Sequence, residues 1–189
     1  MSQLLAMSAS RLGCSERTLR RYINDGLLHG RRVGGRRWEL PPEEDDYLGR
    51  HCELLSALRR TLRTEPAVRL AVLFGSTAVG EDDRNSDVDL LLVSRNPTPL
   101  ALAGMALRLR RALRRKVDVV GLEQAEAMPS LLADVLQEGR VLVDRDGVWP
   151  SLLQRQQEIV AAASRAEGAL VTNAHAAVRE ARERIAAAA

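Results

Sequence analysis

Two short apolar runs that flank a Gly-Ser turn and an aspartate pair constrain the fold more than any other stretch of this sequence. Residues 71–74 and 90–93 are continuous apolar segments bounded by turn residues, which is typical of strands buried on both faces. Asp87 and Asp89 lie at the start of the second strand. Their side chains should project to one side of that strand, while Val88 points into the core. The pattern predicts two buried strands with paired carboxylates at one end.

The residues between the two runs suit a phosphate and a divalent cation. Two adjacent carboxylates repel each other, and a hard cation such as Mg²⁺ removes that penalty. Gly75 lacks a Cβ, so its backbone can approach a ligand closely. Ser76 follows at the start of a predicted helical turn, where a hydroxyl and free N–H groups can bind phosphate. This combination indicates nucleotide chemistry.

The order and spacing of these residues extend over a longer part of the chain. Gly75-Ser76 is followed by ten residues and then by the Asp87 and Asp89 pair, and a later predicted strand supplies Asp118. The whole resembles the signature of the DNA polymerase β-type nucleotidyltransferases, and more narrowly of their minimal (MNT) branch. The likeness covers roughly residues 65–145 and implies an α+β fold, a small mixed sheet with flanking helices.

The resemblance also implies a role for each of these residues. Asp87 and Asp89 would hold Mg²⁺ or Mn²⁺, while Asp118 would bind a second ion or act as a base toward the attacking hydroxyl. Gly75 and Ser76 would position the terminal phosphates of ATP. The implied reaction is transfer of a nucleotidyl group, most often AMP from ATP, to a hydroxyl.

One departure from the family leaves several functions open. Minimal members commonly carry Arg where this sequence has Val79. Enzymes of this branch often act as antitoxins that adenylylate a partner HEPN ribonuclease toxin, which favours a protein acceptor and an antitoxin-like role. The alternatives are an adenylyltransferase for an antibiotic or other small molecule, a toxin that nucleotidylates tRNA, and a non-catalytic regulator that only binds nucleotide. The absent arginine supports the last of these.

Basic charge is concentrated in the N-terminal part of the sequence. Residues 1–40 hold eight arginines against three acidic residues, a net charge of +5. Because the whole chain carries +3, the remaining residues carry −2. A local excess of this kind points to an anionic partner.

The same region carries the pattern of two short helices and a hairpin. Ser8 and Ser15 could each cap a helix, with Gly13 at the turn between the helices. Two basic arms about a Gly-Gly turn then predict a hairpin, or wing. The pattern resembles the winged helix-turn-helix of MerR and excisionase-type proteins, which implies DNA binding and autoregulation of transcription. The arginines expected to face DNA are Arg17, Arg20 and Arg21 on the second helix and Arg31, Arg32, Arg36 and Arg37 in the wing.

Breaker residues and composition divide the 189 residues into four parts. We expect a DNA-binding winged helix-turn-helix at 1–42 and a connecting helix at 43–64, which could pair with a second copy to form a homodimer. A nucleotidyltransferase core follows at 65–146, and a helical segment at 147–189 completes the chain. Within the core, residues 100–116 should form an amphipathic helix with arginines near its end.

Membrane and metal-cluster proteins of the usual kinds are not favoured. The sequence has no apolar run of membrane-spanning length and no signal-peptide pattern at its start, so we expect a cytoplasmic location. Cys14 and Cys52 lack metal-site spacing and suit a reducing compartment. The three histidines are scattered and do not predict a zinc site.

Overall fold

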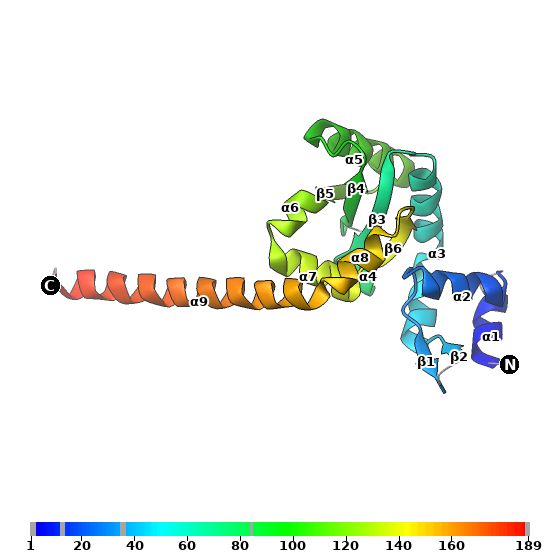
Figure 1. The fold of residues 1–189 in the computed structure, drawn as a ribbon, viewed down its shortest axis with the longest axis horizontal. Helices are drawn as coiled ribbons and strands as arrows, with labels where there is room; N and C mark the ends of the chain where they lie inside the picture. The colour runs from blue at the N-terminus through cyan, green and yellow to red at the C-terminus, as the bar shows by residue number, and fades with distance from the viewer. Residues whose placement is uncertain (1–2, 12–13, 35–36, 84, 188–189) are drawn as a thin grey trace.

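The structure, a computed structural model, describes residues 3–11, 14–34, 37–83 and 85–187 (Figure 1). The helices are α1 Gln3–Arg11, α2 Glu16–Asn24, α3 Pro42–Arg63, α4 Ser76–Val79, α5 Pro99–Leu113, α6 Leu122–Glu126, α7 Pro129–Glu138, α8 Val148–Gln154 and α9 Gln156–Ala187. The strands are β1 Arg31–Val33, β2 Arg37–Glu39, β3 Val68–Phe74, β4 Val88–Ser94, β5 Val117–Gly121 and β6 Arg140–Asp144.

A four-stranded mixed sheet forms the centre of the molecule, in the order β5-β4-β3-β6. The strand β3 is antiparallel to both of its neighbours, whereas β4 and β5 are parallel. The two strands expected at the apolar runs are β3 and β4, and every residue of β3 except Arg69 is buried. The predicted α+β fold with a small mixed sheet is therefore confirmed.

Helices cover both faces of this sheet, because β3 and β4 are apolar on both sides. On one face, Leu73 and Leu90 pack under α3 and α5 in a first core. On the other face, Val72 and Leu91 belong to a second core formed with α6, α7 and α8. The long α9 packs along α7 and then extends away from the rest of the molecule (Figure 1).

The N-terminal part consists of two helices and a hairpin. Ser15 caps α2, since its Oγ accepts a hydrogen bond from the Thr18 amide at 3.1 Å. The expected Ser8 cap is wrong: α1 already begins at Gln3, so Ser8 lies inside the helix and is buried. The antiparallel hairpin pairs Arg32 with Trp38, as the wing pattern predicts. Gly13 and Arg36, on which the turn and part of the wing were argued, lie outside the described residues.

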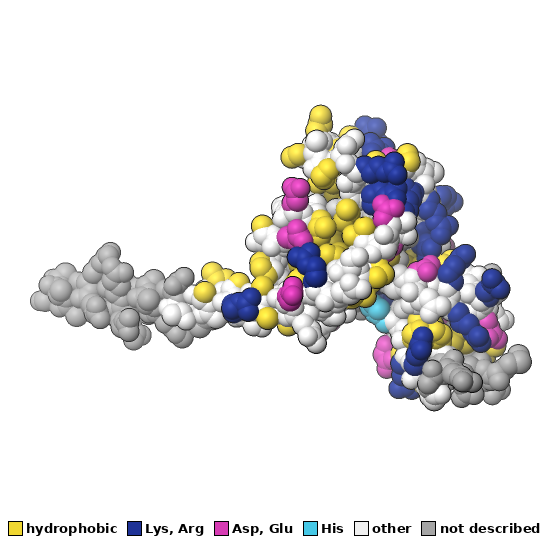
Figure 2. All heavy atoms as spheres, viewed as in Figure 1, with side chains coloured by type: hydrophobic (Ala, Val, Ile, Leu, Met, Phe, Trp, Pro, Cys, Tyr) yellow, Lys and Arg dark blue, Asp and Glu magenta, His cyan; other side chains and the backbone are white. Residues whose placement is uncertain are grey.

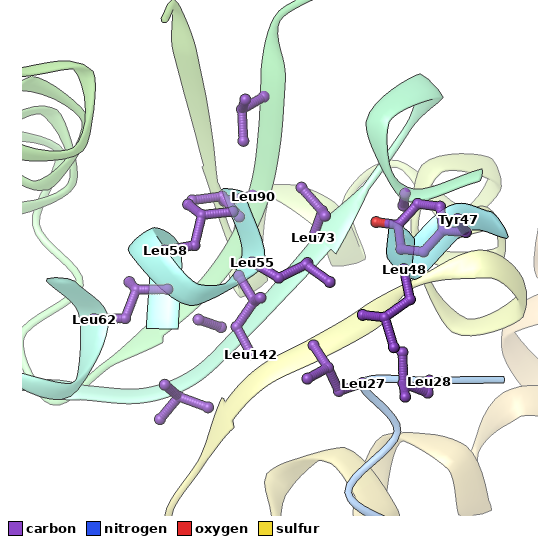
Figure 3. Close-up of a cluster of buried hydrophobic side chains, with 14 of the residues drawn as sticks. Leu27, Leu28, Tyr47, Leu48, Leu55, Leu58, Leu62, Leu73, Leu90 and Leu142 are labelled. Carbon is purple, nitrogen blue, oxygen red and sulfur yellow. The ribbon is translucent and has the colours of Figure 1, made fainter. Parts of the chain in front are cut away.

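The first core joins the N-terminal helices to the sheet (Figure 3). Leu27 and Leu28, in the segment after α2, are almost fully buried and belong to the same core cluster as Leu48 of α3 and Leu142 of β6. Farther along α3, Leu58 packs against the sheet in the same cluster. The helix expected as a connector is thus an integral layer of the fold.

Two further helices differ in extent from their predicted ranges. The helix expected at 100–116 ends at Leu113, because Arg114 adopts a left-handed conformation with φ of 53°. Lys116 therefore lies in the loop before β5 and not on the helix. The C-terminal helical segment is divided into α8 and α9 at Arg155. No helix in the described part of the chain combines the length and apolar character needed to cross a bilayer.

Candidate functional site

The turn after β3 brings the backbone against a carboxylate. Gly75 has φ of 72°, a conformation that side-chain-bearing residues rarely adopt, and Ser76 begins the short helix α4. A Cβ built on Gly75 would lie 2.7 Å from Oδ2 of Asp89, so any other residue would displace that carboxylate. The structure thus requires glycine here for its backbone conformation and for the close approach of Asp89, while its place beside a ligand stays a prediction.

The three predicted aspartates come together at one end of the sheet. Asp89 and Asp118 are direct partners in the parallel pair formed by β4 and β5, so their side chains share a face. Asp87 precedes β4 and lies across from Lys116, whose carbonyl oxygen accepts a hydrogen bond from the Val88 amide at 3.0 Å. The topology therefore places all three carboxylates near the Gly75 turn.

Two cations pair with Asp87 and Asp118. Lys116 Nζ donates to Oδ2 of Asp87 and contacts Oδ2 of Asp118 at 3.2 Å. Arg110 Nη2 donates to the other oxygen of Asp118 at 3.1 Å. The hydrogen bonds from Lys116 to the two carboxylates raise the pKa of its ammonium. Sequence reasoning missed Lys116, although its place beside Asp118 is the available signal.

The electrostatics of Asp89 show an excess of negative charge at this end of the sheet. Burial raises the pKa of Asp89, and the neighbouring carboxylates of Asp118 and Asp87 raise it further, against a smaller opposing effect of Lys116. As the side chains lie, no group of three or more Asp, Glu, His or Cys residues within the described ranges is arranged to hold a metal ion. The donor set, carboxylate oxygens with unbalanced charge, nevertheless suits Mg²⁺ or Mn²⁺.

A buried network fixes the loop that leads to the first aspartate. His51 Nε2 lies 2.7 Å from Oδ1 of Asp82, and Arg115 Nη2 lies 3.2 Å from the other carboxylate oxygen. Burial raises the pKa of Asp82, but the hydrogen bonds from His51 and Arg115 outweigh it and keep that pKa below its usual value. Arg115 also donates to the carbonyl of Ser86 at 2.8 Å, next to Asp87.

The sequence of this region matches the family described as polymerase beta, nucleotidyltransferase, over residues 56–147. Residues 56–147 are a polymerase β-type nucleotidyltransferase domain. The matched range contains the Gly75 turn, all three aspartates and the whole four-stranded sheet. Most of α3 and the N-terminal helices lie before it. No curated protein matches the sequence significantly.

Solved structures share the fold of the nucleotidyltransferase domain. A toxin–antitoxin protein crystallised with AMP-PNP aligns with a TM-score of 0.54 and 24% identity, covering 64% of this chain and 98% of that one. A mutant form of the MntA–HpeT toxin–antitoxin aligns with a TM-score of 0.54 and 22% identity over the same shares. The MntA–HepT toxin–antitoxin gives 0.50 and 21%, with 64% and 96% covered.

A buried arginine supports the nucleotidyltransferase domain from beneath α4. Arg140, the first residue of β6, is 3% exposed and forms a bidentate pair with Glu44 of α3, one arm of which measures 2.9 Å. Its Nε donates to the carbonyl of Ala78 in α4 at 2.6 Å, and its guanidinium lies 3.5 Å from the centre of the Tyr47 ring. Sequence reasoning missed this residue, whose one signal is a charge at the start of an apolar strand.

The arginines predicted to face DNA lie on an exposed surface where they are described. Arg17, Arg20 and Arg21 are exposed on α2, and Arg31 and Arg32 are exposed in the hairpin. Figure 2 shows Lys and Arg side chains gathered along one edge of the molecule, from α5 down to these helices. Arg36 lies outside the described residues, and of Arg37 only the backbone is described, in β2.

Replacing Lys116 with alanine should let Mg²⁺ raise the melting temperature at a lower metal concentration than in the parent. The ammonium no longer competes with the metal for Asp87 and Asp118. The measurement is thermal unfolding across a Mg²⁺ titration without nucleotide. An Arg111→Ala variant, which removes an exposed charge from α5, is the matched control. Equal titration midpoints for the parent and Lys116→Ala would show that Lys116 does not compete.

Proposed function

We propose that this protein is a Mg²⁺-dependent nucleotidyltransferase that moves AMP from ATP to a hydroxyl group of a partner protein. The observation that carries the proposal is the juxtaposition of Asp89 and Asp118 in register beside the Gly75 turn, inside a domain of nucleotidyltransferase type. The role is antitoxin-like, with a HEPN-type toxin as the protein that accepts AMP. The N-terminal module of the present protein, residues 1–42, would bind DNA and regulate transcription of the operon that encodes the protein.

Each residue of the proposed site has its own role in the transfer. Gly75 allows the backbone to approach the nucleotide, and the Ser76 hydroxyl orients its terminal phosphates. The acceptor oxygen attacks the α-phosphorus of ATP and pyrophosphate leaves. Asp87, Asp89 and Asp118 would hold the divalent ions, which when bound offset the charge of the phosphates. Asp118, if it is not a ligand, would take the proton of the acceptor hydroxyl.

Two of the structural relatives support the choice of substrate and partner. One toxin–antitoxin relative was crystallised with AMP-PNP, an ATP analogue, and another is the MntA–HepT pair. Their fold is that of the nucleotidyltransferase domain in this chain, and the likeness covers 98% and 96% of their own lengths. The protein acceptor is inferred from these relatives and not from a residue of the site.

Labelling with ATP that carries radioactive α-phosphate tests the acceptor. The full chain with Mg²⁺ is incubated in a lysate of its own cells, and we expect one labelled protein band. The Asp87→Asn/Asp89→Asn variant is the control and should leave that band unlabelled. Label in RNA or in a small molecule would identify another acceptor and exclude the antitoxin-like role. Absence of any label would favour the second candidate.

That second candidate is a regulator that binds nucleotide without transferring it. One observation favours it: Lys116 and Arg110 already pair with Asp87 and Asp118, two of the three carboxylates that a metal would need. Val79, where minimal nucleotidyltransferases commonly carry Arg, is exposed on α4 and supplies no charge. Binding of ATP with unchanged nucleotide after long incubation would distinguish this regulator from the enzyme.

The proposed DNA contacts should fall into two kinds with different behaviour. Removing Arg31 or Arg32 from the wing should weaken binding to all duplexes and reduce the salt slope by about one, because such arginines neutralise phosphates. Removing Arg17 or Arg20 from α2 should cost about 1–3 kcal/mol at one base position, because a helix in the major groove reads base edges. Arg155→Ala, which removes an exposed arginine between α8 and α9, is the control and should leave DNA binding unchanged.

A mobility shift on the protein's own upstream DNA, repeated across a salt series, measures both effects. The parent should bind that DNA far more tightly than a random duplex of equal length. Equal affinity for the two duplexes would refute the regulatory part of the proposal and leave only the transferase.

A further inference from the structure

Arg59 of α3 is a buried cation without a counter-ion. The residue is 8% exposed, and its Nη1 atom has no hydrogen-bond partner among the described residues. Its guanidinium lies 4.5 Å from the centre of the Tyr22 ring, which provides a cation–π contact. No carboxylate of the described residues forms an ion pair with it.

Such an arrangement is unfavourable unless something else pairs with the charge. A guanidinium nitrogen shut off from solvent, as Nη1 of Arg59 is, loses its hydration, and one aromatic face does not replace it. Arg140 shows the usual solution in the same fold, since Glu44 and the carbonyl of Ala78 take its donors. The contrast with Arg140 indicates that the Arg59 guanidinium lacks a partner that a bound ligand would supply.

Arg59 lines a groove of about 440 Å³ between the end of α2, α3, β6 and α8. Arg63, one helical turn farther along α3, lies on the same side, because residues four apart share a helix face. Trp149 and Pro150 of α8 give the groove an apolar wall, and Asn24 stands at the end of α2. The volume is in the range of small-molecule sites.

The other charged groups of the groove are mostly engaged. The Asp144 carboxylate accepts hydrogen bonds from the Val148 and Trp149 amides at 3.0 and 3.1 Å. Arg145 donates to backbone carbonyls at and beyond the end of α3, at 2.8 to 3.4 Å. The charges left to face a ligand are therefore Arg59 and Arg63 against Asp25, an excess of positive charge.

We propose that this groove binds a small phosphate-bearing molecule of about nucleotide size, with its phosphate against Arg59 and Arg63. A phosphate offers several acceptor oxygens to the planar donors of arginine, so it can satisfy a guanidinium that a single carbonyl cannot. The apolar wall at Trp149 takes the organic part of the molecule. The groove is distinct from the proposed transfer site, because β6 is one edge of the sheet and Asp118 lies on β5, the other edge.

Occupancy of the groove would connect a small molecule to the N-terminal helices. Asn24 and Asp25 belong both to this groove and to the outer surface of α2 that carries Arg17 and Arg20. A ligand held between α2 and β6 would favour one position of α2 against the sheet. The site would thus act on the DNA-binding module and not on the chemistry of transfer.

Fluorescence of Trp149 tests the site in the full chain. A Trp38→Phe/Asp87→Asn/Asp89→Asn background leaves Trp149 as the sole indole and removes two of the three proposed metal-binding carboxylates. Inorganic phosphate and AMP, without divalent metal, are the probes. We expect a saturable change with AMP, weakened roughly tenfold by Arg63→Ala. Arg60→Ala, on an exposed position of the same helix, should leave it unaltered.

Arg59→Met provides a second, independent measurement. It should abolish the fluorescence response and keep or raise the melting temperature, because it removes an uncompensated buried charge. A lowered melting temperature would show that the guanidinium is already satisfied and would overturn the proposal. So would a saturable response that survives both Arg63→Ala and Arg59→Met.

A DNA duplex tests whether the groove binds the phosphates of nucleic acid instead of those of a small molecule. If AMP and phosphate give no saturable response while a duplex gives one that requires Arg63, the groove belongs to the DNA surface and the proposal fails. Because every measurement uses a variant without the paired aspartates, the result is independent of whether the protein transfers AMP.

Discussion

Asp87→Asn and Asp89→Asn should each lower the rate of nucleotidyl transfer by about 10²–10³-fold or more while leaving the fold intact. An amide keeps the size of the carboxylate but removes the charge that would bind the divalent ions stabilising the transferred phosphate. For Asp89 the metal-free protein should be equally or more stable after the change, because burial and like charges already raise the pKa of this residue.

The measurement pairs the initial rate of AMP transfer with circular dichroism and thermal unfolding of each variant. Asp134→Asn, which removes an exposed carboxylate from α7, is the matched control and should transfer at the parental rate. Parental rates in both the Asp87 and Asp89 variants would mean that this end of the sheet is not the active site.

Glu44→Ala should cost about 3–5 kcal/mol of the free energy of unfolding, because it leaves the Arg140 guanidinium buried and unpaired. Glu44 is 6% exposed, accepts both guanidinium arms of Arg140 and also accepts the His29 amide at 2.8 Å. The pair therefore joins the segment after α2 to α3 and β6. Urea unfolding monitored by circular dichroism measures the effect.

Glu43, the residue before Glu44, is exposed at the start of α3 and provides the matched control. Glu43→Ala should change the free energy of unfolding by about 0.5 kcal/mol or less. If Glu44→Ala costs no more than Glu43→Ala, the ion pair does not support the fold. Because Arg140 also holds the carbonyl of Ala78, the Glu44 variant should in addition weaken nucleotide binding at α4.

Local patterns in the sequence account for the parts of the site that were predicted. Apolar runs of strand length and a glycine between them fix Gly75 at the end of β3, and period-two alternation fixes Asp87 and Asp89 on one side of Val88. The place of Asp118 followed from a resemblance to known enzymes, and the parallel register of β4 and β5 brings it beside Asp89. These features depend on neighbours only a few residues away or on one well-defined strand pairing.

Most of the features that could not be predicted from the sequence depend on pairs of residues far apart in the chain. Glu44 and Arg140 are separated by 96 positions, and His51 and Asp82 by 31, so no local period relates them. The Ser8 cap failed because serine also occurs inside helices when tertiary packing buries it, as here within α1. Lys116 escaped notice because the helix with arginines near its end was expected to continue to residue 116, whereas it ends at Leu113.

The continuous core has a consequence for the order in which the chain folds. Leu27 and Leu28 share one core cluster with Leu142, and the Leu27 carbonyl accepts a hydrogen bond from Arg140 at 3.4 Å, a contact that spans 113 positions. During synthesis from the N-terminus, the two basic helices emerge long before the strand that completes their packing. Their native arrangement must wait until β6 has left the ribosome. A nascent or truncated chain that lacks the nucleotidyltransferase sheet would leave Leu27 and Leu28 without part of their core, so the N-terminal helices and the sheet would complete their folding together.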